Sequence, residues 1–118
     1  MNEKSGLDLI NESKSRIREV SAADAVVNPE PGVVYFDCRE PNEYALGHIP
    51  GAVFIPRGNL ETKIEAALSR DRKILIYCAT GNRSALAADT MQQMGYTDVA
   101  SMSGGFRGWV DAGGKVES

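Results

Sequence analysis

Two stretches of the chain carry consecutive apolar residues, mostly β-branched or aromatic, and each ends abruptly at small or polar residues. They predict strands at residues 33–36 and 73–77. Such runs are typical of strands that are buried on both faces of a sheet. Three shorter segments, at residues 17–20, 52–55 and 98–100, are the other strand candidates. The pattern therefore predicts five strands.

Segments with apolar residues at helical spacing separate these strands. They predict helices over residues 5–16, 22–27, 42–46, 60–68 and 84–94, with a final helical turn at residues 106–109. Ser21 and Asn59 are expected to cap the second and fourth helices, and Gly95 is expected to end the fifth. The first helix is only weakly amphipathic, so it is either a terminal arm or a contact for a partner.

Strands that alternate with helices predict an α/β fold with right-handed crossovers and helices on both faces of a parallel sheet. The carboxyl ends of parallel strands lie along one edge, and ligands bind there. We therefore expect the segments near residues 21, 37–40, 56–58, 78–84 and 101–105 to gather around one crevice. This places Arg57 among the candidate site residues.

The composition narrows the class of protein. A chain of 118 residues that is 42% hydrophobic suits one domain with one core. The net charge of −3 argues against a nucleic-acid partner. The acidic N-terminus does not resemble a secretory signal. No apolar window is long enough for a membrane anchor. We therefore expect a cytoplasmic protein. Two cysteines and one histidine fit neither a disulfide framework nor a metal site, and no metal or cofactor is predicted.

The strongest candidate chemistry lies where the strand at residues 73–77 meets the following helix. Cys78 stands at this junction, and Arg83 is the only charged residue between it and Ser84. Backbone amides at a helix N-terminus attract anions, and such a setting lowers the pKa of a thiol. The alternative is a buried structural cysteine at the end of a strand. We favour the reactive thiol because glycine, arginine and serine follow it in the loop.

A second cluster of polar residues follows the strand at residues 33–36. It begins with Asp37, Cys38 and Arg39 and stops at Pro41. A solvated turn is the alternative interpretation of this cluster. His48 lies in a rigid glycine–proline loop, and an isolated histidine there is more often structural than catalytic.

Four segments carry a resemblance to a known family. In chain order they are Asp37-Cys38-Arg39-Glu40, then Glu43 to Ala52 with Gly47-His48-Ile49-Pro50-Gly51, then Cys78 to Ser84, then Gly104-Gly105-Phe106-Arg107-Gly108-Trp109. Together they resemble the single-domain rhodaneses, which are thiosulfate sulfurtransferase-like proteins, over roughly residues 17 to 113. The resemblance implies a rhodanese-like three-layer fold with a central, mainly parallel five-stranded sheet. It divides the chain into an N-terminal helical arm, 1–16, and a rhodanese domain, 17–118.

The resemblance also implies roles for individual residues. Cys78 matches the nucleophile that forms a persulfide. The residues expected to cradle its sulfur are Ala79, Thr80, Gly81, Asn82, Arg83 and Ser84. The residues expected to support this loop are Asp37, Arg39, Glu43 and His48, to which the crevice argument adds Arg57. Cys38 departs from the aliphatic residue expected between the acid and the arginine, and its role stays open between packing and redox chemistry.

The activity implied is transfer of a sulfane sulfur from thiosulfate or another persulfide donor to cyanide or a thiol, without a cofactor. A sulfur-relay protein is a further expected partner. Neither a nucleic acid nor a membrane is expected as a partner. A sulfur carrier or interaction module of the same fold is the alternative, and a redox-sensing domain is a further one. A phosphatase or arsenate reductase fits less well, because such loops have five residues between cysteine and arginine and this loop has four. A cysteine hydrolase that pairs Cys78 with His48 lacks a residue to orient the histidine.

Overall fold

Five strands and six helices alternate along the chain in the computed structural model, which describes residues 3–118. The strands are β1 (Arg18–Ser21), β2 (Val34–Asp37), β3 (Val53–Phe54), β4 (Ile74–Tyr77) and β5 (Val99–Ser103). The helices are α1 (Gly6–Arg16), α2 (Ala22–Val27), α3 (Pro41–Leu46), α4 (Leu60–Ala67), α5 (Asn82–Gln93) and α6 (Gly105–Asp111), with a 3-10 turn, η1 (Arg57–Asn59), before α4.

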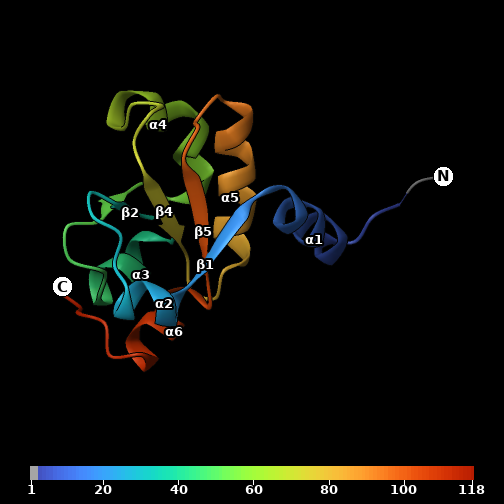
Figure 1. The fold of residues 1–118 in the computed structure, drawn as a ribbon. Coiled ribbons are helices and arrows are strands. Elements are labelled where there is room, and N and C mark those ends of the chain that lie inside the picture. Colours follow the sequence, from blue (N-terminus) through green and yellow to red (C-terminus); the bar gives the residue numbers. More distant parts are fainter. Residues whose placement is uncertain (1–2) are drawn as a thin grey trace.

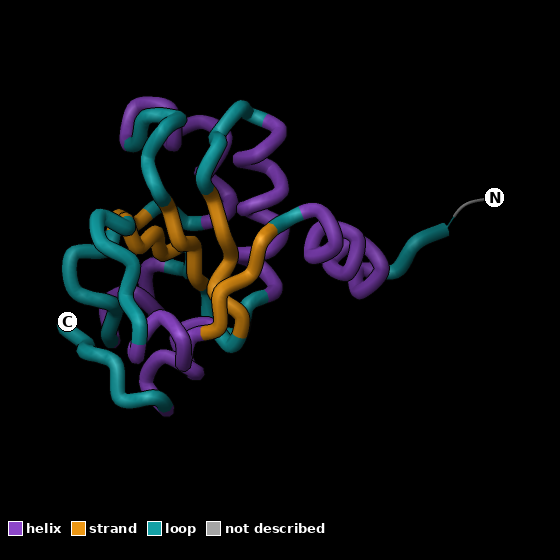
Figure 2. Tube along the Cα trace, in the orientation of Figure 1, coloured by secondary structure: helices purple, strands orange, loops and turns teal. Residues whose placement is uncertain are grey.

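The strands form one sheet in the order β1-β5-β4-β2-β3. Every neighbouring pair is parallel, so all five carboxyl ends meet at one edge. Strand β4 is central, between β5 and β2. Figure 2 shows the strands in the middle of the domain with helices on both sides. The predicted three-layer α/β fold with a parallel five-stranded sheet is confirmed.

Alternate residues of β4 serve two separate hydrophobic cores. Ile74 and Ile76 face the core beneath α4 and α5, whereas Leu75 and Tyr77 face the core beneath α2 and α6. All four are buried. This alternation explains why the strand has no polar position: each side chain meets a covered face of the sheet.

The local signals were mostly interpreted correctly. The Ser21 hydroxyl accepts from the backbone N–H of Asp24 and caps α2. Gly95 follows the C-cap of α5 with φ +93°, and its N–H bonds back to the helix, as predicted for a glycine stop. Asn59 is the N-cap residue of α4, as predicted, but its side chain makes no capping hydrogen bond. Asn59 also ends η1, and this 3-10 turn leads directly into the helix.

Helix α1 packs beside α5 through one polar cluster and otherwise extends away from the sheet (Figure 1). The Asp89 carboxylate of α5 accepts from the Ser13 hydroxyl at 3.0 Å and from Arg16 Nη2 at 2.7 Å. Both Ser13 and Asp89 are buried. Leu7 and Leu9, near the start of α1, are exposed. The carboxyl-terminal half of α1 therefore holds it to the domain.

No helix within residues 3–118 is both long and apolar enough to cross a lipid bilayer.

Replacement of Asp89 by alanine should loosen α1 while the sheet stays folded. The change removes the acceptor of the hydrogen bonds from Ser13 and Arg16 and leaves the buried Ser13 hydroxyl unpaired, at a cost of about 1–3 kcal/mol. Backbone amides of α1 should then exchange with solvent faster, and trypsin should cut after Arg16 sooner. Glu12→Ala, which breaks the exposed pair with Lys4, is the control and should change neither rate. Unchanged exchange in Asp89→Ala would contradict the assigned tether.

Candidate functional site

The Cys78 sulfur lies at the carboxyl end of β4, inside the loop that leads into α5. It accepts hydrogen bonds from the backbone N–H of Gly81 at 3.1 Å and of Ser84 at 3.4 Å. The Ser84 hydroxyl lies 3.5 Å from the sulfur, where it accepts from the thiol and can donate to the thiolate. Gly81 is the N-cap of α5, so the sulfur also lies at the positive end of that helix. The loop is thus arranged around an anion at the sulfur position.

Glycine at position 81 is required by conformation and by space. Its φ of +108° is strained for other residues. A Cβ there would approach the Met102 carbonyl oxygen at 3.3 Å and the Gly104 nitrogen at 3.4 Å. This backbone turn lets the Gly81 N–H point at the sulfur.

The turn between β5 and α6 holds the other side of the cysteine loop. The Phe106 N–H donates to the Cys78 carbonyl at 2.8 Å, and the Arg107 N–H donates to the Ala79 carbonyl at 3.2 Å. Gly105 approaches so closely that a Cβ would lie 2.5 Å from the Ala79 oxygen, at a φ of +60°. Contact with α6 therefore fixes the loop carbonyls, while the loop amides remain directed at sulfur.

A pair of serines supports the donor side. The Ser84 hydroxyl lies 2.8 Å from the Ser101 hydroxyl of β5, and both side chains are fully buried. A buried hydroxyl needs a partner. Ser101 supplies one, and this contact holds Ser84 beside the thiol.

The electrostatic balance at Cys78 favours the thiolate. Burial raises its pKa, because a charged sulfur loses hydration. The hydrogen bonds from the Ser84 hydroxyl and amide, and from the amides of Gly81 and Thr80, act in the opposite direction. Their combined effect is larger, so the pKa of the Cys78 thiol lies below its ordinary value.

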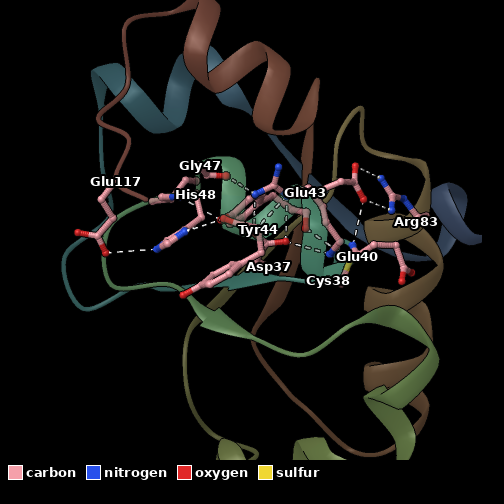
Figure 3. A network of polar contacts seen from close by, with 12 residues as sticks. Asp37, Cys38, Glu40, Glu43, Tyr44, Gly47, His48, Arg83 and Glu117 are labelled. Carbon is pink, nitrogen blue, oxygen red and sulfur yellow. Dashed lines mark hydrogen bonds and ion pairs between the residues drawn. The ribbon is translucent and has the colours of Figure 1, made fainter.

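Arg83, in the first turn of α5, forms an ion pair with Glu43 of α3. Its two terminal nitrogens donate to both oxygens of Glu43, at 2.8 and 3.0 Å (Figure 3). Hydrogen bonding from Arg83 lowers the pKa of Glu43 to about 2. Arg83, the one charged residue of the loop, is thus paired with a carboxylate and ties the loop to α3.

Asp37 and Arg39 form a buried ion pair below this bridge. Arg39 donates to both carboxylate oxygens, with Nη2 at 2.8 Å, and also to the Gly47 carbonyl. Its guanidinium lies over the Phe106 ring, 4.3 Å from the centroid. The pair thus joins the end of β2 to the end of α3 and to the start of α6.

His48 makes contacts away from the thiol. Its Nδ1 lies 3.0 Å from the Tyr44 carbonyl, its Nε2 lies 3.4 Å from a Glu117 oxygen, and its ring stacks on Tyr44 (Figure 3). Backbone hydrogen bonds between His48 and Glu117 dock the C-terminal segment. Within residues 3–118 no hydrogen bond links His48 to Cys78, which favours the structural interpretation of this histidine.

Arg57 lies at the start of η1, beyond β3. Its guanidinium donates to Glu61 at 3.0 Å and to the Thr90 hydroxyl at 3.3 Å, and its N–H donates to the Cys38 carbonyl. It therefore connects three elements at the carboxyl edge of the sheet.

Cys38 is fully buried, one position beyond β2. Its sulfur lies 3.4 Å from the Tyr77 carbonyl oxygen. Burial, followed by the nearby Cys78 and Asp37, raises the pKa of the Cys38 thiol far above its ordinary value. The pKa of Cys38 is thus shifted upward, whereas the pKa of Cys78 is shifted downward.

The strand ends that sequence reasoning expected together do meet at one edge of the sheet, but several supporting contacts were missed. Ser101 could have been found, since a serine inside an otherwise apolar strand suggests a buried polar partner. The close approach of Gly105 and the docking of Glu117 on His48 gave no sequence signal. Within residues 3–118, no group of three or more histidine, cysteine or acidic side chains is placed to hold a metal ion.

Residues 21–112 match the family model described as the rhodanese-like domain. YrkF of Bacillus subtilis, whose name assigns it provisionally to the sulfur carriers, is 37% identical over 91% of this chain. The chain spans 57% of the length of YrkF, and 62% of that of YqhL from the same organism. The thiosulfate sulfurtransferase GlpE of Pseudomonas fluorescens is 34% identical over 80% of this chain and 86% of its own length.

A solved structure from Rhodopseudomonas palustris, RPA3614, superimposes with a TM-score of 0.89. It is 38% identical, and the match covers 99% of this chain and 97% of that one. RPA3614 is described as a protein of unknown function and a possible tyrosine phosphatase.

Alkylation of Cys78 by iodoacetamide should follow a pH profile whose inflection lies below that of a free thiol, since the loop donors stabilise the thiolate. The rate is measured by intact mass in the Cys38→Ala background, which has a single thiol. Ser84→Ala should move the inflection to higher pH by removing the hydroxyl donor. Ser69→Ala, which alters an exposed serine far from the loop, is the matched control. An inflection at or above that of free cysteine would refute activation by the loop.

Proposed function

Because the chain belongs to the rhodanese family, we propose that it is a sulfurtransferase that carries a sulfane sulfur on Cys78. One observation carries this proposal: the backbone amides of Gly81 and Ser84 already donate to the Cys78 sulfur, and the Ser84 hydroxyl lies beside it. Donors fixed before the reaction stabilise negative charge without reorganisation. Here that charge is first a thiolate and then a persulfide.

In the first half-reaction the Cys78 thiolate attacks the outer sulfur of thiosulfate. The S–S bond of thiosulfate breaks, sulfite leaves with the bonding electron pair, and Cys78 becomes a persulfide anion. No proton moves, so the step requires no general base. The engagement of His48 with Tyr44 and Glu117 is consistent with that.

In the second half-reaction a nucleophilic acceptor removes the outer sulfur. Cyanide attacks it, thiocyanate leaves, and the Cys78 thiolate is restored. A thiol acceptor would leave as a persulfide in the same way. The covalent intermediate divides the transfer into two displacements. Its negative charge remains beside the same loop donors throughout.

Arg83 and the buried Asp37–Arg39 pair act through position in this proposal. The Arg83–Glu43 ion pair links the cysteine loop to α3. The Asp37–Arg39 pair holds the end of β2 against α3, the helix that supplies Glu43. Loss of either pair should disturb the loop without removing the nucleophile.

A phosphatase is the second candidate, because RPA3614 is described as a possible one. The loop argues against it here: four residues separate Cys78 from Arg83, and Arg83 is held by Glu43. A loop that surrounds a phosphoryl group needs five residues and a free arginine. A sulfur carrier loaded by a partner protein is the third candidate, in keeping with the name of YrkF.

Cys78→Ser should lower thiosulfate:cyanide sulfurtransferase activity by at least about 10³-fold, since a hydroxyl cannot carry the sulfane sulfur. Cys38→Ala is the matched control, because it alters the other buried cysteine and should retain thiocyanate formation. Initial rates with both substrates varied should give the parallel double-reciprocal lines of ping-pong kinetics. Equal losses in both variants would contradict these roles, and loading only by a partner protein would indicate a carrier.

Aryl phosphates should not be hydrolysed at a rate above that of the Cys78→Ser variant. Insertion of one glycine between Gly81 and Arg83 should abolish sulfur transfer, because it displaces the donors from the sulfur. Release of the phenol from the phosphate ester is followed by absorbance. Cysteine-dependent hydrolysis by the unmodified protein would overturn the argument from loop size.

A further inference from the structure

The two cysteines of the chain lie side by side at the ends of neighbouring strands. Strands β2 and β4 pair in parallel up to Asp37 and Tyr77, and the next residues are Cys38 and Cys78. The Cys38 N–H donates to the Tyr77 carbonyl at 3.1 Å, which continues the ladder by one residue. The cysteines therefore face each other across adjacent strands.

Both thiols also lie on the same face of the sheet. Cys38 and Cys78 belong to the core beneath α4 and α5. Neighbouring strands are about 4.7–4.9 Å apart, and a disulfide joins Cα atoms roughly 4.4–6.8 Å apart. The strand spacing thus allows the two sulfurs to be joined with little movement of the backbone.

Cys38 lies in the same core as Cys78. Its side chain is fully buried. Among the described residues, its sulfur has one hydrogen-bond partner, the Tyr77 carbonyl. The proposed sulfur transfer does not use this thiol. The sulfur carried by the neighbouring Cys78 is the reactive group that the strand register places beside it.

We propose that Cys38 resolves the Cys78 persulfide when no acceptor arrives, closing a Cys38–Cys78 disulfide and releasing the sulfane sulfur as hydrosulfide. This inference rests on the proposed persulfide. The Cys38 sulfur attacks the inner sulfur, the bond between inner and outer sulfur breaks, and the electron pair leaves with the outer sulfur. The proton of Cys38 ends on that sulfur, which departs as HS⁻. The sulfane sulfur is reduced as two cysteines are oxidised, so no external oxidant takes part.

The arrangement favours attack on the inner sulfur. The donors from Gly81 and Ser84 belong to the loop side of Cys78, and in the proposed persulfide they hold the outer sulfur there. Cys38 approaches from β2, on the strand side. Attack from the strand side with departure from the loop side suits displacement at the inner sulfur.

The outer sulfur of the Cys78 persulfide leaves in one of two ways: an acceptor takes it, or attack by Cys38 releases it. A protonated thiol is a weak nucleophile, so an acceptor such as cyanide that is present in excess removes the outer sulfur first. Without an acceptor the persulfide converts slowly to the disulfide. A dithiol must then reduce the disulfide before the next cycle. The second cysteine thus gives the enzyme a sulfide-releasing activity and a way to stop turnover.

The experiment incubates the reduced wild-type protein with thiosulfate, without cyanide or oxygen, then removes excess thiosulfate and follows sulfide and intact mass. The wild-type protein should first gain one sulfur and then release an equivalent of sulfide, ending lighter than the starting protein by two hydrogens. Cys38→Ala should take up the same sulfur, keep it and release none. Cys38→Val fills the site with an aliphatic residue and guards against a packing defect. Cys78→Ser should show neither change.

The outcomes separate this inference from the proposed function. A wild-type persulfide as stable as that of Cys38→Ala would overturn the inference and leave the sulfurtransferase intact. Transfer of the outer sulfur to Cys38, located by peptide mapping after alkylation, would also overturn it. Failure of every variant to take up sulfur would overturn the proposed function itself. A disulfide that appears with sulfide, and that dithiothreitol reverses, supports the inference.

Discussion

The close contact between the cysteine loop and the start of α6 is the constraint on which the site depends. Amides of Phe106 and Arg107 hold the carbonyls of Cys78 and Ala79, and Gly105 lies too near these carbonyls to carry a side chain. With its carbonyls engaged there, the loop directs its amides at the sulfur. An unsupported loop of this length would offer those amides to water and would lose the preorganisation that stabilises a sulfur anion. The strand order makes the contact possible, since β5, which leads into α6, is the neighbour of β4.

Two ion pairs, Asp37–Arg39 and Arg83–Glu43, connect this contact to β2 and α3. The Asp37–Arg39 pair is buried, and burying two charges has a large desolvation cost. The cost is offset because Arg39 also bonds to Gly47 and lies over an aromatic ring. The result is a fixed relation between β2, α3 and α6. Glu43 on α3 is thereby held where it meets Arg83. The buried Asp37–Arg39 pair thus positions the half-exposed Glu43–Arg83 pair.

The two cysteines show how surroundings decide the chemistry of one residue type. Each follows a strand of the same sheet, and each is buried. Burial disfavours the charged form of both. At Cys78 the donors of the loop more than offset it, whereas the Cys38 thiol donates a hydrogen bond to the Tyr77 carbonyl, which stabilises the protonated form. The pKa of one thiol is therefore lowered, and the pKa of its neighbour is raised.

The sequence by itself determined the class of fold and the position of the cysteine loop between a strand and a helix, because these follow from short-range patterns. Apolar runs specified the buried strands, and the glycine after Met94 specified a helix end. The junction at Cys78 specified where amides would gather. The sequence did not show that the Asn59 side chain makes no capping hydrogen bond, because a 3-10 turn precedes the helix, or that Arg83 pairs with a carboxylate forty positions away. Only the tertiary structure decided the contacts of Ser101, Gly105 and Cys38, because they arise where strands distant in sequence become neighbours in the sheet, and sequence spacing carries no information on such pairs.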